Sequence, residues 1–566
     1  MLRNLTAQEI LLLEQMGSSA DDWSQVLVAE GFSPSQVRGC RFGGAVEIGK
    51  DVLLVDSHIA NYRIGARSQV RSTIALECRE ASTFGNGVSV AAVNENGGRA
   101  IKIHTALSAQ VAYIGAMYRH RPRLVEALEA RAQLVADESR STMGVVGCDC
   151  RIIGAKFVRE VNLFNGATIE GASLVENATL MSGAYVGVDA KVQNAIVVEG
   201  ARVDTGATLN RCFVGECAVV AGGFSAVDTL FFANSHCENG EACSVFAGPY
   251  TVSHHRSSLL IAGLFSFFNA GSGTNQSNHL FKSGAVHQAV HRRGCKFASN
   301  AYVMAPSAEG AFTTVLGRHT HHHDTSEFPF SYLMERDSLS YLLPGYGLQS
   351  YGTARDVAKW PQRDRRSVCR DLISFEEYNP VLAGAAVEAV KRLELLASQS
   401  PHADQYRYKG VVISRSMLQR GLSLYRQYIA ASLAAMLSQG SSEATVCDRW
   451  IDLGGAYVRQ AVVETLLDEV EAGVVEVAAI DLRLRAEVER YSDEAHGWAK
   501  ALFVEREGRE PSVEDISALE VVAEPLSRLV ERDAERDADP ETGVGYGVDS
   551  LDDQVRMADF KAVRGL

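Results

Sequence analysis

Small and aliphatic residues repeat with a period of about six in the middle of the chain. Alanine recurs eight times between Ala167 and Ala207 at steps of five or six residues, and an aliphatic residue stands two places after each alanine. Glycine, asparagine or aspartate precedes most of these alanines. An α-helix repeats about every 3.6 residues and a β-strand about every two, so neither element alone produces the pattern.

A triangular solenoid explains the six-residue period. Each flat side is a strand of about six residues and three sides make one coil, so the aliphatic residue points into the prism and the small residue fits the corner. Glycine and asparagine supply the left-handed backbone conformation that such corners need. Shorter stretches with the same pattern occur at residues 44–49, 64–66, 214–215, 219–220 and 247–248.

The repeat resembles the hexapeptide-repeat superfamily. That resemblance implies a mainly β fold, a single-stranded left-handed parallel β-helix, here with a helical insertion and a C-terminal α-helical domain. Apolar residues at three- and four-residue spacing indicate the helices. The expected parts are an N-terminal helical cap (1–37), the β-helix (38–350) with its helical insertion (116–142), a bridge (351–378), the α-helical domain (379–535) and an acidic tail (536–566).

Histidines gather toward the C-terminal end of the expected β-helix. Ten of the fifteen histidines lie between His236 and His323, where the hexapeptide pattern becomes less regular. Regular structure that gives way to ionisable residues is typical of a functional site built on a scaffold.

The segment Asn278-His279-Leu280 is similar to the catalytic-histidine segment in the acetyltransferase domain of the bifunctional glucosamine-1-phosphate acetyltransferase/uridylyltransferase enzymes. The resemblance implies that His279 is the general base and that Asn278 orients it. A histidine with a pKa near its usual value of about 6.5 can accept a proton at neutral pH. We include His287, from the same polar stretch, as a third catalytic candidate.

Basic and amide side chains surround this segment and predict an anionic substrate. Arginine binds phosphate through paired hydrogen bonds, and lysine adds a further positive charge. The expected substrate-binding residues are Asn275, Gln276, Lys282, Gln288, Arg292, Arg293, Lys296 and Arg318. The leading hypothesis is an acyltransferase that uses acetyl-CoA or another acyl-CoA and acts on a phosphorylated or nucleotide-linked, sugar-like small molecule.

A second hypothesis uses the histidine run that follows Arg318. His319, His321 and His323 would share one face of a strand, because side chains alternate along it. Imidazoles beside a carboxylate bind zinc, iron or nickel, so a metal-dependent lyase or hydrolase is an alternative. The spaced histidine pattern of the gamma-class carbonic anhydrases, which are β-helix metalloenzymes, is absent. A β-helix scaffold without enzymatic activity is the third hypothesis.

The region from Gly273 to about Arg366 also resembles a bacterial hexapeptide-repeat family for which no activity is established. The shared segments are Gly273-Thr274-Asn275-Gln276-Ser277-Asn278-His279, Val286-His287-Gln288, Asp324-Thr325-Ser326, Pro329-Phe330-Ser331-Tyr332 and Trp360-Pro361. This resemblance implies the fold alone.

Composition narrows the expected partners and location. The net charge of −14 disfavours nucleic acid, and no stretch approaches the ~20 apolar residues of a membrane span. Eleven cysteines follow neither a zinc-ribbon nor a disulfide spacing. We therefore expect a cytoplasmic protein without a nucleic-acid or membrane partner. Hexapeptide-repeat enzymes typically form trimers, which implies a homotrimer.

Overall fold

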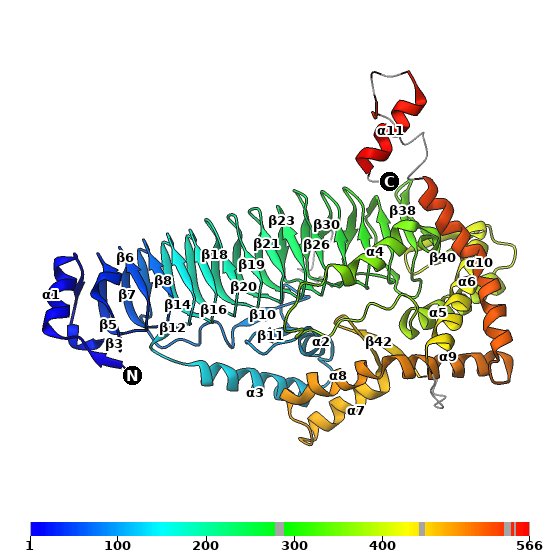
Figure 1. Ribbon diagram of the computed structural model, residues 1–566. Coiled ribbons are helices and arrows are strands. Elements are labelled where there is room, and N and C mark those ends of the chain that lie inside the picture. The colour runs from blue at the N-terminus through cyan, green and yellow to red at the C-terminus, as the bar shows by residue number, and fades with distance from the viewer. Residues whose placement is uncertain are drawn as a thin grey trace.

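The computed structural model describes residues 2–277, 288–440, 448–536, 545–547, 549 and 551–564. Short parallel strands stack along one axis into an elongated solenoid, and helices cover one flank and the C-terminal end (Figure 1). The predicted fold class is therefore confirmed: the chain is mainly β, with a parallel β-helix, a helical insertion and a C-terminal helical region.

Successive coils of the solenoid are related by a nearly constant step along the chain. Strand β16 (Leu174–Leu180) pairs in parallel with β18 (Lys191–Val197), which pairs with β20 (Thr208–Val214). Leu174, Lys191 and Thr208 lie opposite one another, a step of 17 residues. This step corresponds to three sides of about six residues each, as the repeat predicts.

Each coil divides into three sides because its long strand bends. In β16 the bend falls at Asn177, whose φ of 46° lies in the left-handed region that asparagine tolerates. Residues before the bend form the first side and residues after it form the second side. Strand β17 (Tyr185–Val186) forms the third side, in a separate sheet.

The aliphatic positions of the repeat point into the prism with one exception: after Ala172 the interior residue is Val175, three places on, and Leu174 is half-buried. Val175, Val192 and Leu209 form one interior column, and each is at most 1% exposed. The repeated alanines are buried as well. This continuous apolar column is the main core of the protein.

The insertion is larger than predicted. It lies between β9 (Ala75–Glu77) and β12 (Gly144–Val146), where the coil would otherwise turn from its first to its second side. It contains the hairpin β10 (Ser89–Ala91) and β11 (Ala100–Lys102), followed by α2 (Ala109–Met117) and α3 (Pro122–Ser139). Helix α2 is apolar on nearly all sides and mostly buried, so its sequence lacks the one-sided pattern that predicts a helix.

The hairpin of the insertion covers the outer surface of the second side. Val90 packs with Ile196, Phe213, Leu230 and Phe246, which point outward from successive coils. This second apolar cluster attaches the insertion to the solenoid.

The solenoid begins within the expected N-terminal cap. Helix α1 (Ala7–Gln15) is present and buries Leu13. Strands β1 (Leu2–Asn4), β2 (Ser19–Ala20) and β3 (Val26–Ala29) also form, and β2 and β3 pair with β5 (Arg41–Ile48).

The C-terminal region packs on the end of the solenoid and turns back along its flank (Figure 1). Its helices are α5 (Pro380–Gln399), α6 (Arg415–Gln439), α7 (Gln460–Glu471), α8 (Ile480–Glu489), α9 (Tyr491–Glu507) and α10 (Val513–Arg536). Helices α7 and α8 share an apolar cluster with α2 and α3 of the insertion.

The expected helical domain also contains two antiparallel hairpins. They are β40 (Gln405–Tyr408) with β41 (Val411–Ser414), and β42 (Trp450–Leu453) with β43 (Ala456–Arg459). Strand β41 pairs with β39 (Leu339–Leu343), which joins the domain to the end of the solenoid. The expected bridge contains α4 (Tyr351–Gln362), and the expected acidic tail contains α11 (Asp553–Arg564). No helix among the described residues has the length and apolar content of a membrane span.

Candidate functional site

Histidines and one glutamate occupy interior positions in the last coils of the solenoid. Gln276 and His319 lie in one interior column, with Val303 between them. His291 and Glu309 continue the column that Phe265 occupies in the preceding coil. His323 lies in a third column, opposite Ser307. These polar side chains are at most 4% exposed, so the parallel register has placed them where apolar residues stand in earlier coils.

Hydrogen bonds connect four of these residues in series. The backbone N–H of Ile261 donates to Gln276 Oε1 at 3.0 Å, which leaves the amide nitrogen of Gln276 to donate to His291 Nε2 at 2.9 Å. The Nδ1 atom of His291 bonds to one carboxylate oxygen of Glu309, and His323 Nε2 bonds to the other at 2.6 Å.

Glu309 and His323 form a buried ion pair. Burial disfavours both charges, but the contacts with His291 and His323 outweigh it and lower the pKa of Glu309. Burial likewise opposes the charge on His323, yet the hydrogen bond to Glu309 raises the pKa of this histidine. The second ring nitrogen of His323 faces the backbone carbonyl of His321 at 3.3 Å, so both nitrogens can donate.

His319 is the neutral member of the group. Its Nδ1 lies 2.8 Å from Ser340 Oγ, and its Nε2 has no hydrogen-bond partner among the described residues. The centroids of the His319 and His323 rings are 5.8 Å apart. Burial, together with the nearby charge of His323, lowers the pKa of His319 to about 4.

The structure corrects the prediction that His319, His321 and His323 share one face of a strand. Strand β36 (Arg318–His319) ends at the first histidine and β37 (His323–Thr325) begins at the last. The chain turns a corner between them, so His319 and His323 point into the prism from two sides while His321 is exposed. Alternation along a strand does not continue through such a corner.

A cavity lies on the outer surface of the second side, where the solenoid, the insertion and the C-terminal region meet. Its volume is about 60 Å³ when counted as the space open to the centres of water-sized molecules, and about 560 Å³ when all empty space, including the part open to solvent, is counted. Its lining includes Tyr113 of α2, Phe246, Leu264, Val290 and Arg292 of the solenoid, and Asp452 and Tyr457 of the last hairpin. Most of these walls are apolar, as in many small-molecule sites.

Arg292 is the exposed cation of this cavity. Among the described residues no carboxylate pairs with its side chain, because Asp452, the acid in the lining, is held by Arg293. Arg292 directly follows β31 (Ala289–His291), whose Val290 also lines the cavity.

An unusually long connection precedes β31. Asn275 lies opposite Tyr302 in the next coil, 27 residues further along, which is about ten more than one coil needs. The extra length falls between β30 (Asn275–Ser277) and β31. Of the predicted site residues, Asn278, His279, Lys282 and His287 belong to this connection and lie outside the described residues.

The other predicted substrate-binding residues lie in several places. Gln276 is inside the prism, and Asn275 Oδ1 is buried without a hydrogen-bond partner among the described residues. Gln288 accepts a hydrogen bond from Arg99 of the insertion at 2.8 Å. The remaining cations contact protein groups: Lys296 pairs with Asp356 of α4, and Arg318 stacks on Tyr302 at 4.7 Å. The described members of the set therefore do not converge on one cleft.

Arg293 attaches the C-terminal region to the solenoid. Its side chain is buried, and Nε donates to Asp452 at 2.7 Å. The other two guanidinium nitrogens donate to the backbone carbonyls of Ser374 and Gly455 at 2.8 and 2.6 Å. The guanidinium also stacks against the Tyr457 ring at 4.3 Å. These contacts give Arg293 a role in domain docking, which the sequence did not indicate because Asp452 lies 159 residues away.

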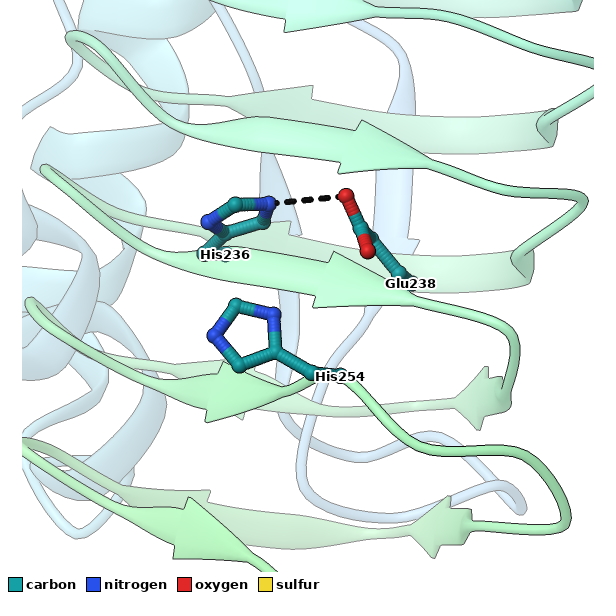
Figure 2. A group of neighbouring side chains, drawn as sticks. All are labelled: His236, Glu238 and His254. Atoms are coloured by element: carbon teal, nitrogen blue, oxygen red, sulfur yellow. Dashed lines mark hydrogen bonds and ion pairs between the residues drawn. The ribbon is translucent and has the colours of Figure 1, made fainter. Parts of the chain in front are cut away.

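A second cluster, which sequence reasoning missed, lies on the outer surface of the third side. His236, Glu238 and His254 gather there with potential ligand atoms within 4.8 Å of one another (Figure 2). It is the one such group of three found among the described residues. The signal in the sequence is a His-x-Glu segment followed by another histidine 16 residues after the glutamate, about one coil later.

Comparison with known proteins shows the family. Residues 2–54 and 50–397 match the family described as "Domain of unknown function (DUF4954)", and the chain belongs to that family. Residues 429–566 match a second description, "Domain of unknown function (DUF6819)". The first match spans the solenoid and ends within α5, and the second begins within α6.

A curated relative and a solved structure are examples of the proteins to which this chain is similar. An "Uncharacterized protein" of Treponema pallidum (strain Nichols) is 25% identical over 464 residues, which cover 69% of this chain and 61% of that protein. The chain thus spans about 61% of the relative's length. The UDP-N-acetylglucosamine acyltransferase of Francisella novicida is 10% identical and has a TM-score of 0.14. The matched region covers 50% of this chain and 84% of the acyltransferase chain.

Replacing Arg293 should release the C-terminal region. Arg293→Ala leaves Asp452 without its buried partner, so the free energy of unfolding should fall by ~3–5 kcal/mol. Hydrogen exchange should rise in β42 and β43. Arg293→Lys should not restore stability, because one ammonium cannot reach three separate acceptors. The control Arg151→Ala, at an exposed position on β13 (Arg151–Ile153), should change stability by less than ~0.5 kcal/mol. Equal effects of Arg293→Ala and Arg151→Ala would contradict this role.

The low pKa of His319 should make stability depend on pH. Between pH 4 and 6.5, His319 binds fewer protons in the folded chain than in the unfolded chain. Its contribution to the free energy of unfolding is therefore fully present above pH 6.5 and is lost as the pH falls toward 4. From pH 6.5 to 4, the wild type should lose roughly 3 kcal/mol more than His319→Gln. Urea unfolding at several pH values measures the difference. The control His402→Gln, at an exposed position, should keep the wild-type dependence of the free energy of unfolding on pH. If His319→Gln also keeps that dependence, His319 is not responsible for it.

Proposed function

We propose that this chain is an acyltransferase that acts on an anionic, phosphorylated or nucleotide-linked, sugar-like molecule bound in the cavity beside β31. The observation that carries the proposal is the position of this cavity. It has mostly apolar walls and an exposed arginine, Arg292, that pairs with no carboxylate among the described residues, and it lies against the strand that follows the histidine-bearing connection.

The cavity offers complementary contacts for such a substrate. Apolar and aromatic walls bury the uncharged part of a ligand, and a few polar groups orient it. Arg292 supplies a guanidinium that can bind a phosphate through two hydrogen bonds. Lys282, in the connection before β31, is the second cation that we assign to the anion. Arg293 is excluded from this role because its guanidinium already contacts Asp452 and two carbonyls.

The proposed chemistry assigns one role to each candidate in the connection. His279 takes the proton from the acceptor amine as its nitrogen attacks the thioester carbonyl of acyl-CoA. The carbon–nitrogen bond forms, the carbon–sulfur bond breaks, and the proton passes to the departing thiolate. Asn278 orients His279, and His287 is held as a secondary catalytic candidate. These roles rest on the similarity of Asn278-His279-Leu280 to the acetyltransferase segment.

The buried network has a supporting role in this proposal. His291 belongs to β31 and points into the prism, where Gln276 and Glu309 hold its ring. The same strand carries Val290 and leads to Arg292 at the cavity. Fixing the inner side of β31 therefore fixes the positions of the groups on its outer side.

A homotrimer and a cytoplasmic location remain predictions that belong to this proposal. The insertion and the last hairpin cover part of the second side, so we propose that neighbouring subunits meet on other surfaces of the solenoid. The metal-dependent hypothesis built on His319, His321 and His323 is not carried forward, because the shared strand face on which it depended is not formed.

The test is thiol release from acetyl-CoA with a panel of amino sugars, their phosphates and their nucleotide derivatives. The wild type should turn over at least one anionic acceptor. His279→Ala should lower kcat by ~10²–10⁴-fold, the contribution of a general base. Arg292→Ala should mainly raise the KM for that acceptor, and the control Arg151→Ala should match the wild type. Unchanged turnover in His279→Ala, or no thiol release from the wild type with any acceptor, would refute the proposal.

A further inference from the structure

Two successive coils bring three metal-ligating side chains together on the third side of the solenoid (Figure 2). His236 and Glu238 are the first and last residues of β23 (His236–Glu238), so both point outward while Cys237 between them is buried. In the next coil, Val252 and Ser253 of β26 lie opposite His236 and Cys237. The residue that follows, His254, therefore lies beside Glu238.

The three side chains converge on one another. His236 Nε2 lies 3.0 Å from Glu238 Oε1, and the rings of His236 and His254 meet edge to face with centroids 4.3 Å apart. One ligand atom from each residue falls within 4.8 Å of the other two. A single ion could therefore contact all three residues after small side-chain rotations.

The surrounding backbone holds this arrangement and leaves it open. The Asn239 amide donates to the carbonyl oxygen of His254 at 3.1 Å, which fixes the chain beyond β26 against the coil that carries Glu238. In the coil before Glu238, the residue opposite it is Ala221. In the coil after His254, Ala270 lies opposite Ser253, so the following residue, Gly271, lies beside His254. Because both neighbours are small, no large side chain from the adjacent positions of these two coils covers the outer side of the cluster.

We propose that His236, Glu238 and His254 bind one divalent transition-metal ion, with zinc as the reference ion. Two imidazoles and one carboxylate suit Zn²⁺, Fe²⁺, Co²⁺ and Ni²⁺, whereas Mg²⁺ and Ca²⁺ prefer oxygen ligands throughout. Three protein ligands leave at least one position for water or a ligand. The cavity lies on the second side and this cluster on the third, so the proposal does not depend on the proposed acyltransferase activity.

The experiment measures metal binding by the full-length protein after tag removal and chelator treatment. Zn²⁺ is titrated in competition with a chromogenic chelator, and Co²⁺ is followed by its visible absorption. The wild type should bind one equivalent, with a Co²⁺ spectrum of low-coordinate geometry. The double variant His236→Ala/His254→Ala should lose that equivalent. Glu238→Gln should weaken metal binding by at least ~10–100-fold, which is the loss typical when a residue that only hydrogen-bonds to a metal ligand is replaced.

Matched variants show whether the cluster itself is responsible. His255→Ala removes the neighbouring exposed histidine and His321→Ala removes an exposed histidine of the other run; both should bind as the wild type does. Zn²⁺ should raise the thermal midpoint of the wild type but not of the double variant, because an ion that binds only the folded state stabilises it. Circular dichroism checks that every variant is folded. The proposal is overturned if the wild type binds neither ion, if the double variant keeps its equivalent, or if His255→Ala or His321→Ala loses as much as the double variant.

Discussion

Backbone hydrogen bonds between successive coils hold each residue of the solenoid opposite the residue one coil away, most often 17 positions along the chain. Side chains alternate between the two faces of a strand, so a slip of one residue would exchange the interior and the surface. The register therefore decides which side chains meet. It gathers Gln276, His291, Glu309 and His323 inside the last coils, and it brings His254 beside Glu238 on the outside.

The polar interior of the last coils strengthens this constraint. Apolar contacts have no preferred direction, but hydrogen bonds need donor and acceptor atoms about 3 Å apart. The series from Ile261 to His323 is satisfied only when every coil keeps its position. Leaving either member of a buried ion pair without its partner costs ~3–5 kcal/mol. The end of the solenoid on which the C-terminal region packs is thus held in a single register.

The sequence predicts the repeating parts well, because the alanine and aliphatic positions report directly on corners and interior. Prediction from the sequence fails where the structure depends on contacts with distant parts of the chain. Helix α2 is apolar on nearly all sides and gives no helical period. The alternation of histidines predicts one strand, because nothing in the sequence marks the corner after His319.

The candidate sites were harder to predict for the same reason. The ion pair between Arg293 and Asp452 joins residues 159 positions apart. The cluster of His236, Glu238 and His254 becomes visible only when the length of one coil is known. The sequence did locate the region of interest, since the buried network, the cavity and the long connection before β31 all involve the stretch where histidines gather.

Engineered disulfides test the register most directly. Lys191 and Thr208 are opposite one another in adjacent parallel strands, which lie about 4.8 Å apart and so within the reach of a disulfide. Oxidised Lys191→Cys/Thr208→Cys should give the linked peptide pair by mass spectrometry. Lys191→Cys/Asn210→Cys, offset by two residues, should give much less. A stronger link in the offset pair would contradict the 17-residue register and the sites that depend on it.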